Sequence, residues 1–225
     1  FKLEPKDCFS TLFIAELSSK NQISGIKGLK IETQERLREG RLQRRANGGQ
    51  YISSFRQVLL RHGMTMTAIA LICMLSSQSI ASLTSKSIDF LSNPEIYVAA
   101  SGLLLLFFVF FLYFRKRAIT VSQALWVGYL LGISIVEEIA FRLAMPLLLA
   151  GVATNLFAIL ISNLLFAGIH YFTLRWKLIP CLFTFLGGLG FARLLDTSEN
   201  IVLVILVHWF VTFLNTPVPP SPRTN

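Results

Sequence analysis

The chain contains little cysteine, and the arrangement of its cysteines suggests no use for them. Cys8, Cys73 and Cys181 lie far apart, are odd in number and form no paired spacing. This argues against a disulfide framework and against a cysteine-based metal site. The sequence also lacks an internal repeat, and its start at Phe1 shows no charged-then-apolar signal pattern. Apolar residues, rather than covalent links, must therefore organise the chain.

Long apolar blocks make up most of the chain after residue 63. Mean hydropathy is +0.61, and 53% of the residues are hydrophobic. About 20 apolar residues cross about 30 Å of hydrocarbon as a helix, whereas the strands of a barrel would alternate over about 10 residues. We predict an all-α, polytopic membrane helix bundle of about six transmembrane helices, near residues 64–84, 96–114, 120–150, 154–172, 178–195 and 201–217.

Basic residues concentrate before the first apolar block. Residues 1–62 hold 12 of the 21 Lys and Arg, and the densest run lies at 35–45. Such a run could bind nucleic acid, but beside a membrane it is better explained as a cytoplasmic-side tail against anionic lipid. We therefore expect membrane lipids, and no nucleic acid, as partners.

Positive charge also orders the connections between the apolar blocks. The basic clusters at 115–117 and 175–177 fall on the same side as the tail. We predict an integral, multi-pass membrane protein whose N- and C-termini both lie on the cytoplasmic or stromal side. Four regions follow: a basic N-terminal segment (1–62), two additional transmembrane helices (63–119), a membrane core (120–217) and a Pro-rich tail (218–225).

The block at 120–150 is unusual in length and in polarity. At about 1.5 Å per residue it would extend about 46 Å, so Pro146 is expected to kink it or to mark where it leaves the hydrocarbon. Its middle contains Glu137 and Glu138, and Arg142 follows four residues after the second. A charge at bilayer depth costs about 2.5 kcal/mol or more, so these residues need a specific reason to be there.

Helix geometry separates the two glutamates. Glu138 and Arg142 share a face and can pair, whereas Glu137 points about 100° away. Ser134, one turn earlier, offers Glu137 only a hydroxyl. We therefore expect Glu137 to be the carboxylate that accepts a proton.

Two later apolar blocks carry polar faces at helical spacing: Asn163, Phe166 and His170 on one, and His208, Thr212 and Asn215 on the other. The economical arrangement turns these faces and the glutamate pair toward one interior. Along the helix axes, Glu138 lies about 20 Å and His170 about 24 Å from the turn that joins their segments, so they can meet. His208 is only about 10 Å into its segment, and reaches the others only if the loop near 195–200 is recessed or the helix is tilted.

Each polar residue also has a purely structural interpretation. A Glu-Glu-Arg set can join helices, a single histidine can form an interhelical hydrogen bond, and Asn and Thr often pack between helices. A proton- or ion-coupled transporter would also use buried Glu and His, but the inverted repeat of broken helices is missing. Taken together, the residues indicate a site.

Three motifs resemble those of the CAAX protease and bacteriocin-processing family, which contains the Ras-converting CAAX endopeptidase. They are Glu137-Glu138-x-x-x-Arg142, Phe166-x-x-x-His170, and His208 after the Gly-rich stretch at 187–193. The resemblance covers about residues 120–216. It implies a multi-helix membrane endopeptidase, and in its CAAX branch the substrates are C-terminal peptides that carry an isoprenyl-cysteine; other branches are linked to bacteriocin immunity and peptide processing.

The resemblance also implies roles for the motif residues. Glu137 would activate water, while Glu138 and Arg142 would shape and support the site. His170 and His208 would position the water or stabilise the oxyanion. The implied mechanism is that of a metal-independent glutamic protease.

One motif position departs from the family. The third motif usually has Asn, sometimes Asp, four residues after its histidine, and in this chain that residue is Thr212. A threonine hydroxyl presents neither an amide nor a carboxylate, and Asn215 lies about 10 Å along the axis from His208. The alternative function is therefore a weak or inactive family member that acts as a membrane scaffold or as an assembly partner in a larger membrane complex.

A metal is the remaining question. Two histidines and carboxylates can bind zinc, but the chain has no His-Glu-x-x-His helix. We expect no cofactor, with zinc as the alternative.

Overall fold

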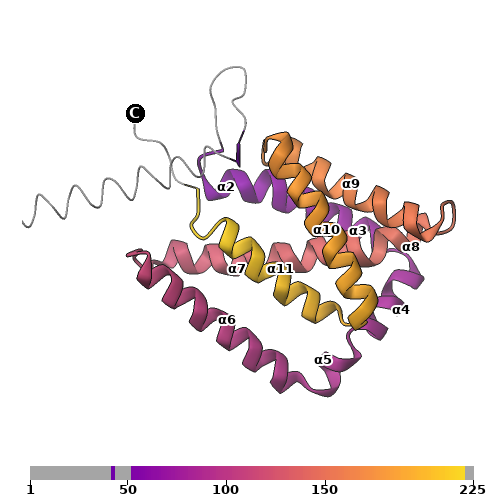
Figure 1. Ribbon diagram of the computed structural model, residues 1–225, viewed down its shortest axis with the longest axis horizontal. Coiled ribbons are helices and arrows are strands. Elements are labelled where there is room, and N and C mark those ends of the chain that lie inside the picture. The colour runs from indigo at the N-terminus through magenta and orange to yellow at the C-terminus, as the bar shows by residue number, and fades with distance from the viewer. Residues whose placement is uncertain (1–41, 44–51, 221–225) are drawn as a thin grey trace, which may run out of the picture. The chain divides into compact units, whose positions relative to one another are not determined.

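The computed structural model describes residues 42–43 and 52–220, and residues 52–220 belong to one helical unit (Figure 1). The predicted all-α membrane bundle is confirmed, since the described residues contain helices and no strand. The elements in order are α2 (Phe55–Val58), η1 (Leu59–Gly63), α3 (Met64–Cys73), α4 (Ser77–Lys86), α5 (Ile88–Ser92), α6 (Pro94–Phe114), α7 (Val121–Glu138), η2 (Ile139–Ala144), α8 (Met145–Leu149), α9 (Asn155–Thr173), α10 (Leu178–Ser198) and α11 (Ile201–Asn215).

The protein is an integral membrane protein by the length and composition of its helices. Four described helices are long and apolar enough to cross a membrane: α6, the continuous helix Val121–Leu149, α9 and α10. A bent pair of helices, Phe55–Cys73 and Ser77–Lys86, could form a fifth span, and α11 is a shorter apolar helix of 15 residues.

The first predicted span is not a single helix. The structure bends by 104° between α3 and α4, where the chain reads Ser76-Ser77-Gln78-Ser79. The apolar block at 64–84 therefore divides into two helices at this polar run.

The long block at 120–150 remains one helical element of 29 residues, Val121–Leu149. Pro146 lies in the first turn of α8 and does not break it. The irregularity falls just before the proline instead, where η2 is a π-helical turn. Proline cannot donate to the carbonyl one turn earlier, and the wider π-turn accommodates this loss within a continuous helix.

The helical bundle begins earlier than the sequence suggests. Ser54 caps α2 by accepting a hydrogen bond from the backbone N–H of Gln57, and the side chains of Ile52, Val58 and His62 are buried. The last part of the expected N-terminal segment is thus helical and packed. The basic run at 35–45, apart from residues 42–43, and the chain end at 221–225 lie outside the described residues.

The connection between α10 and α11 is anchored to the protein at Asn200, while Asp196, Thr197 and Glu199 just before it are exposed. Asn200 caps α11 and accepts from the backbone N–H of Leu203 at 3.0 Å, while its amide donates to Tyr97 at 2.5 Å and to Asp89 at 3.2 Å. Asn200 and Ile201 are buried. These bonds anchor the start of α11, the helix that carries His208.

Helix α11 packs along α7, as Figure 1 shows. The indole N–H of Trp209 donates to the carbonyl of Val127 at 3.1 Å, and that of Trp126 donates to the carbonyl of Thr216 at 2.8 Å. Buried indoles usually find such partners. These two bonds set the register that places the middle of α11 beside the end of α7.

Candidate active site

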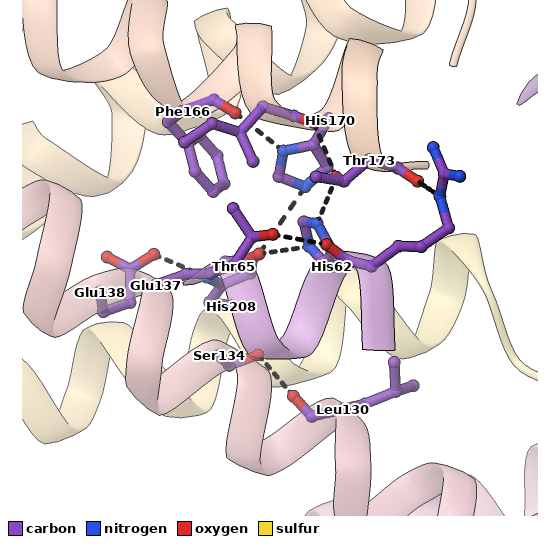
Figure 2. Close-up of polar contacts among 12 residues, drawn as sticks. His62, Thr65, Leu130, Ser134, Glu137, Glu138, Phe166, His170, Thr173 and His208 are labelled. Carbon is purple, nitrogen blue, oxygen red and sulfur yellow. Dashed lines mark hydrogen bonds and ion pairs between the residues drawn. The ribbon is translucent and has the colours of Figure 1, made fainter. Parts of the chain in front are cut away.

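Glu137, the penultimate residue of α7, lies where the chain's three histidines meet (Figure 2). The Nε2 atom of His62 is 2.8 Å and that of His170 3.8 Å from its Oε1, and the Nε2 atom of His208 is 3.5 Å from its Oε2. The glutamate is 2% exposed. The histidines come from η1, α9 and α11, so four separate elements form the cluster.

The second carboxylate pairs as the helix spacing predicts. Arg142 Nε lies 3.4 Å from Glu138 Oε2, and both side chains are fully buried. Glu138 Oε1 is also 2.6 Å from His208 Nδ1. Glu138 therefore links the arginine to a histidine of the cluster, which makes the burial of both charges less costly.

Ser134, which was expected to offer Glu137 a hydroxyl from one turn earlier, does not bond to it. The hydroxyl of Ser134 donates to the carbonyl of Leu130 at 2.8 Å. Glu137 is instead hydrogen-bonded to His62. Hydroxyl-to-carbonyl bonds within one helix are common for serine, and the partner from η1 comes from a part of the chain in which the sequence indicated no motif.

The arginine is held between aromatic rings and a close helix contact. Its guanidinium carbon lies 4.0 Å from the ring centre of Phe166 and 5.8 Å from that of Phe191, in the range of cation–π contacts. A Cβ atom on Gly188 would come within 3.0 Å of Arg142 Nη2 and would overlap the side-chain oxygen of Asn163. The glycine in α10 thus lets that helix approach the buried polar residues of α7–η2 and α9.

Hydrogen bonds fix the protonation of two of the histidine rings. His170 Nδ1 lies 2.9 Å from the carbonyl of Phe166, and His208 Nδ1 lies 2.6 Å from the Glu138 carboxylate. Since these oxygens only accept, each Nδ1 carries the proton and donates it. In the neutral form of each ring, Nε2 then presents a lone pair toward Glu137. Their separations from the carboxylate of 3.8 and 3.5 Å suit a bridging water better than a direct bond.

Both π-helical turns carry site residues. η1 contains His62, and η2 begins directly after Glu138 and contains Arg142. The hydroxyl of Ser162 donates to the carbonyl of Phe141 within η2 at 2.6 Å. Such turns shift the helix register and frequently occur at functional sites.

Of the four supporting residues expected from the sequence, two lie in or beside the cluster and two make no bond to it. Phe166 contacts the His170 ring edge-on with a centroid distance of 4.6 Å, and Asn163 is buried next to Arg142. Thr212 is partly buried and Asn215 is exposed. Within residues 52–220, no hydrogen bond or ion pair joins either of these two side chains to the cluster.

His62 was not predicted from the sequence, because it falls at the end of the region assigned to the N-terminal segment. It is 4% exposed, and its Nδ1 lies 2.8 Å from the hydroxyl of Thr173. The sequence did contain a signal for it. His62 directly precedes the first apolar block, and a histidine in a membrane helix is as unusual there as His170 and His208 are in theirs.

Among the described residues, one group of three side chains in the cluster could hold a metal ion. His62, Glu137 and His170 offer ligand atoms that all lie within 4.8 Å of one another. Zinc bound at about 2.0–2.1 Å in a tetrahedral site holds its ligand atoms about 3.4 Å apart. The contact between His62 and Glu137 is 2.8 Å, a hydrogen-bond length. The residues as placed therefore fit a proton between these two atoms better than an ion.

Residues 120–214 match the family described as type II CAAX prenyl endopeptidase Rce1-like. This confirms the resemblance predicted from the three motifs and supports a membrane peptidase family for this part of the chain. No curated protein and no solved structure matches the chain. His62 lies outside the matched residues, while Glu137, Glu138, Arg142, His170 and His208 lie within them.

Proposed function

We propose that the protein is an intramembrane endopeptidase that hydrolyses a peptide bond with water activated by Glu137. The observation that carries the proposal is the buried carboxylate facing the Nε2 atoms of His170 and His208 at distances that a water can bridge. General bases need a positioned substrate proton within hydrogen-bond reach. A water held between these three side chains meets that requirement.

In this mechanism, Glu137 takes a proton from the water as the oxygen attacks the scissile carbonyl. The carbon–nitrogen bond then breaks, and Glu137 returns the proton to the leaving amine. The protonation of the rings favours a water-positioning role for His170 and His208, because their Nε2 atoms accept and do not donate. Backbone N–H groups, or a histidine protonated during the reaction, would stabilise the oxyanion.

The substrate class follows from the family likeness. We propose a C-terminal peptide that carries an isoprenyl-cysteine, presented from the lipid. Metal independence, a cytoplasmic or stromal position for both termini, membrane lipids as the surroundings and no role for nucleic acid complete the proposal. Glu138 and Arg142 would support the carboxylate cluster rather than contact the peptide.

The experiment uses full-length protein in detergent micelles or liposomes and a fluorogenic peptide ending in a farnesylated CAAX sequence. Glu137→Gln should abolish cleavage while leaving expression and the unfolding midpoint close to those of the wild type. Cleavage should persist in EDTA and in 1,10-phenanthroline. Undiminished turnover by Glu137→Gln would exclude this base, and loss of turnover in chelators would exclude metal independence.

A second function is favoured by one observation. Thr212 stands where the family usually has Asn, and its side chain makes no described bond to the cluster. We propose, as the alternative, a membrane scaffold or assembly partner of other membrane-protein subunits. Stoichiometric co-purification with such subunits, unchanged in Glu137→Gln, together with no cleavage of the farnesylated probe, would favour the scaffold. Thr212→Asn discriminates further, since gain of cleavage would identify a weakened enzyme.

A further inference from the structure

His62 differs from the other two histidines in having an oxygen within direct hydrogen-bond distance of each ring nitrogen. Nδ1 lies 2.8 Å from Thr173 Oγ1, and Nε2 lies 2.8 Å from Glu137 Oε1 (Figure 2). The residue is 4% exposed. Its hydrogen bonds must therefore be satisfied by these two partners.

The direction of the first bond follows from the threonine. Thr173 Oγ1 lies 2.7 Å from the carbonyl oxygen of Ile169. The carbonyl can only accept, so the single hydroxyl proton of Thr173 points to Ile169. The hydroxyl oxygen then accepts from His62, and Nδ1 of His62 carries a proton.

The second bond then needs a proton of its own. A neutral ring with its proton on Nδ1 has a lone pair on Nε2, and a carboxylate also offers only lone pairs. At 2.8 Å the two atoms require a proton between them. His62 and Glu137 therefore share one proton. Only the form with an imidazolium and a carboxylate leaves Glu137 able to act as a base, because a carboxylic acid does not accept a second proton from water.

The other two rings need no additional proton. Their Nε2 atoms stand 3.8 and 3.5 Å from Glu137, beyond a direct hydrogen bond. Charge balance agrees with this assignment, because Glu137, Glu138 and Arg142 together carry one unmatched negative charge in a buried cluster. A single proton on the His62–Glu137 pair neutralises it.

We infer that His62 is a positioning residue for Glu137: its protonated Nε2 donates to Oε1 of the carboxylate, which leaves Oε2 to accept the proton of the attacking water. Oε2 is the oxygen nearer His208. The water's proton passes to Oε2 and from there to the leaving amine, while the proton shared with His62 stays in place. This inference rests on the proposed function, and it gives the helical segment α2–η1–α3, which precedes the family match, a part in the reaction.

The kinetic test compares His62→Phe and His62→Gln with the wild type on the farnesylated fluorogenic peptide. His62→Phe leaves Oε1 without a donor, so kcat should fall by about 10²-fold, the usual scale of a misplaced general base, with KM within about twofold. His62→Gln can donate to Oε1 through its amide and should recover at least about tenfold of that loss. A purely structural role would instead give equal losses in both variants and parallel losses of stability.

A matched control lies in the same π-turn. Leu60 is 53% exposed, so Leu60→Ala should keep wild-type kcat and KM. Thr173→Val removes the acceptor that sets the ring's protonation and should lower kcat, but it should add nothing in the double variant with His62→Phe. Additive losses in the double variant would mean that Thr173 does not act through His62, and would overturn the proposed positioning role.

A measurement without substrate keeps the inference independent of the proposed function. Nitrogen-15 spectra of the three histidine rings, assigned with His62→Phe, should show His62 with Nδ1 protonated. They should also show Nε2 of His62 protonated, and infrared spectra should show no carboxylic-acid band that Glu137→Gln removes. A ring protonated on Nε2 with a bare Nδ1 would overturn it, as would equimolar zinc bound by the wild type and lost in His62→Phe. If the rings behave as expected but the probe is not cleaved, the proposed function fails and the shared proton stands.

Discussion

Two apolar helices of this protein, α6 and Val121–Leu149, look alike as membrane segments and differ in what they contact. Only 11% of the apolar stretch of α6 is buried, against 50% for Val121–Leu149. The second helix carries Glu137, Glu138 and Arg142, whereas α6 carries one acid, Glu95, in its first turn. Apolarity therefore places a helix in the membrane, while buried polar residues show which helix faces the protein interior.

The largest expected effect comes from the polar centre of the buried helix. Arg142→Ala removes the charge partner of Glu138, and breaking a buried pair costs about 3–5 kcal/mol of unfolding free energy. We expect this loss in SDS titrations of the protein in micelles, together with loss of peptidase activity. Leu106 of α6 is 52% exposed, and Leu106→Ala should stay within about 0.5 kcal/mol of the wild type. Equal losses in the two variants would remove the contrast between the helices.

Helix α6 itself has one face packed against the protein and another that faces lipid. Phe108 is 1% exposed and stacks on Phe213 at a centroid distance of 3.9 Å, whereas Phe110 is 51% exposed. Phe108→Ala should lower the unfolding free energy by about 3–5 kcal/mol, and Phe110→Ala should lower it far less. The same SDS titrations measure both changes. A comparable effect of the two would mean that α6 has no preferred face in the bundle.

A smaller effect tests the close approach of α10 to the site. Gly188→Ala places a methyl group against Asn163 and Arg142, and such overpacking typically costs about 1–3 kcal/mol. Activity should fall as well, because the arginine must move. Gly187→Ala is the matched control, since nothing lies within 4 Å of a Cβ atom there. If Gly188→Ala and Gly187→Ala unfold at the same denaturant concentration, the contact is not formed.

The smallest effect is expected at the surface, outside the membrane helices. Lys86 hydrogen-bonds Glu199 at 2.8 Å, and this bond holds the pKa of Glu199 below its ordinary value. A lowered acid pKa stabilises the fold above the ordinary pKa, and that contribution is lost as pH falls through the lowered value. The pair is exposed, so Lys86→Ala should not measurably shift the thermal midpoint at neutral pH or at about pH 3. A clear shift would place this pair among the structural contacts.

Some of the site could be predicted because its geometry is local. Glu138 and Arg142 are four residues apart on one helix, and their pairing follows from that spacing alone. The apolar blocks likewise predict membrane helices, since hydropathy over about 20 residues is a property of the segment itself. The three motifs indicated the peptidase family because they lie within one continuous stretch, residues 120–214.

Other features depend on contacts between distant segments. The bond of His62 to Glu137 spans 75 residues of sequence and that of His208 to Glu138 spans 70, so neither follows from helix periodicity. The two π-turns and the bend between α3 and α4 also shift which side chains face inward. His62 was left outside the predicted site because the sequence assigned it to the N-terminal segment, and only the packing of η1 against α7 and α9 brings it to Glu137.

By itself, the sequence determined that this chain is a helical membrane protein with a charged centre, since the hydrophobic effect and the cost of buried charge act on each segment separately. The tertiary structure alone decided which groups share that centre. Bringing the three imidazole rings to one carboxylate requires helix packing, the anchored start of α11 at Asn200 and a glycine that admits α10, and each of these is a contact between segments far apart in the chain.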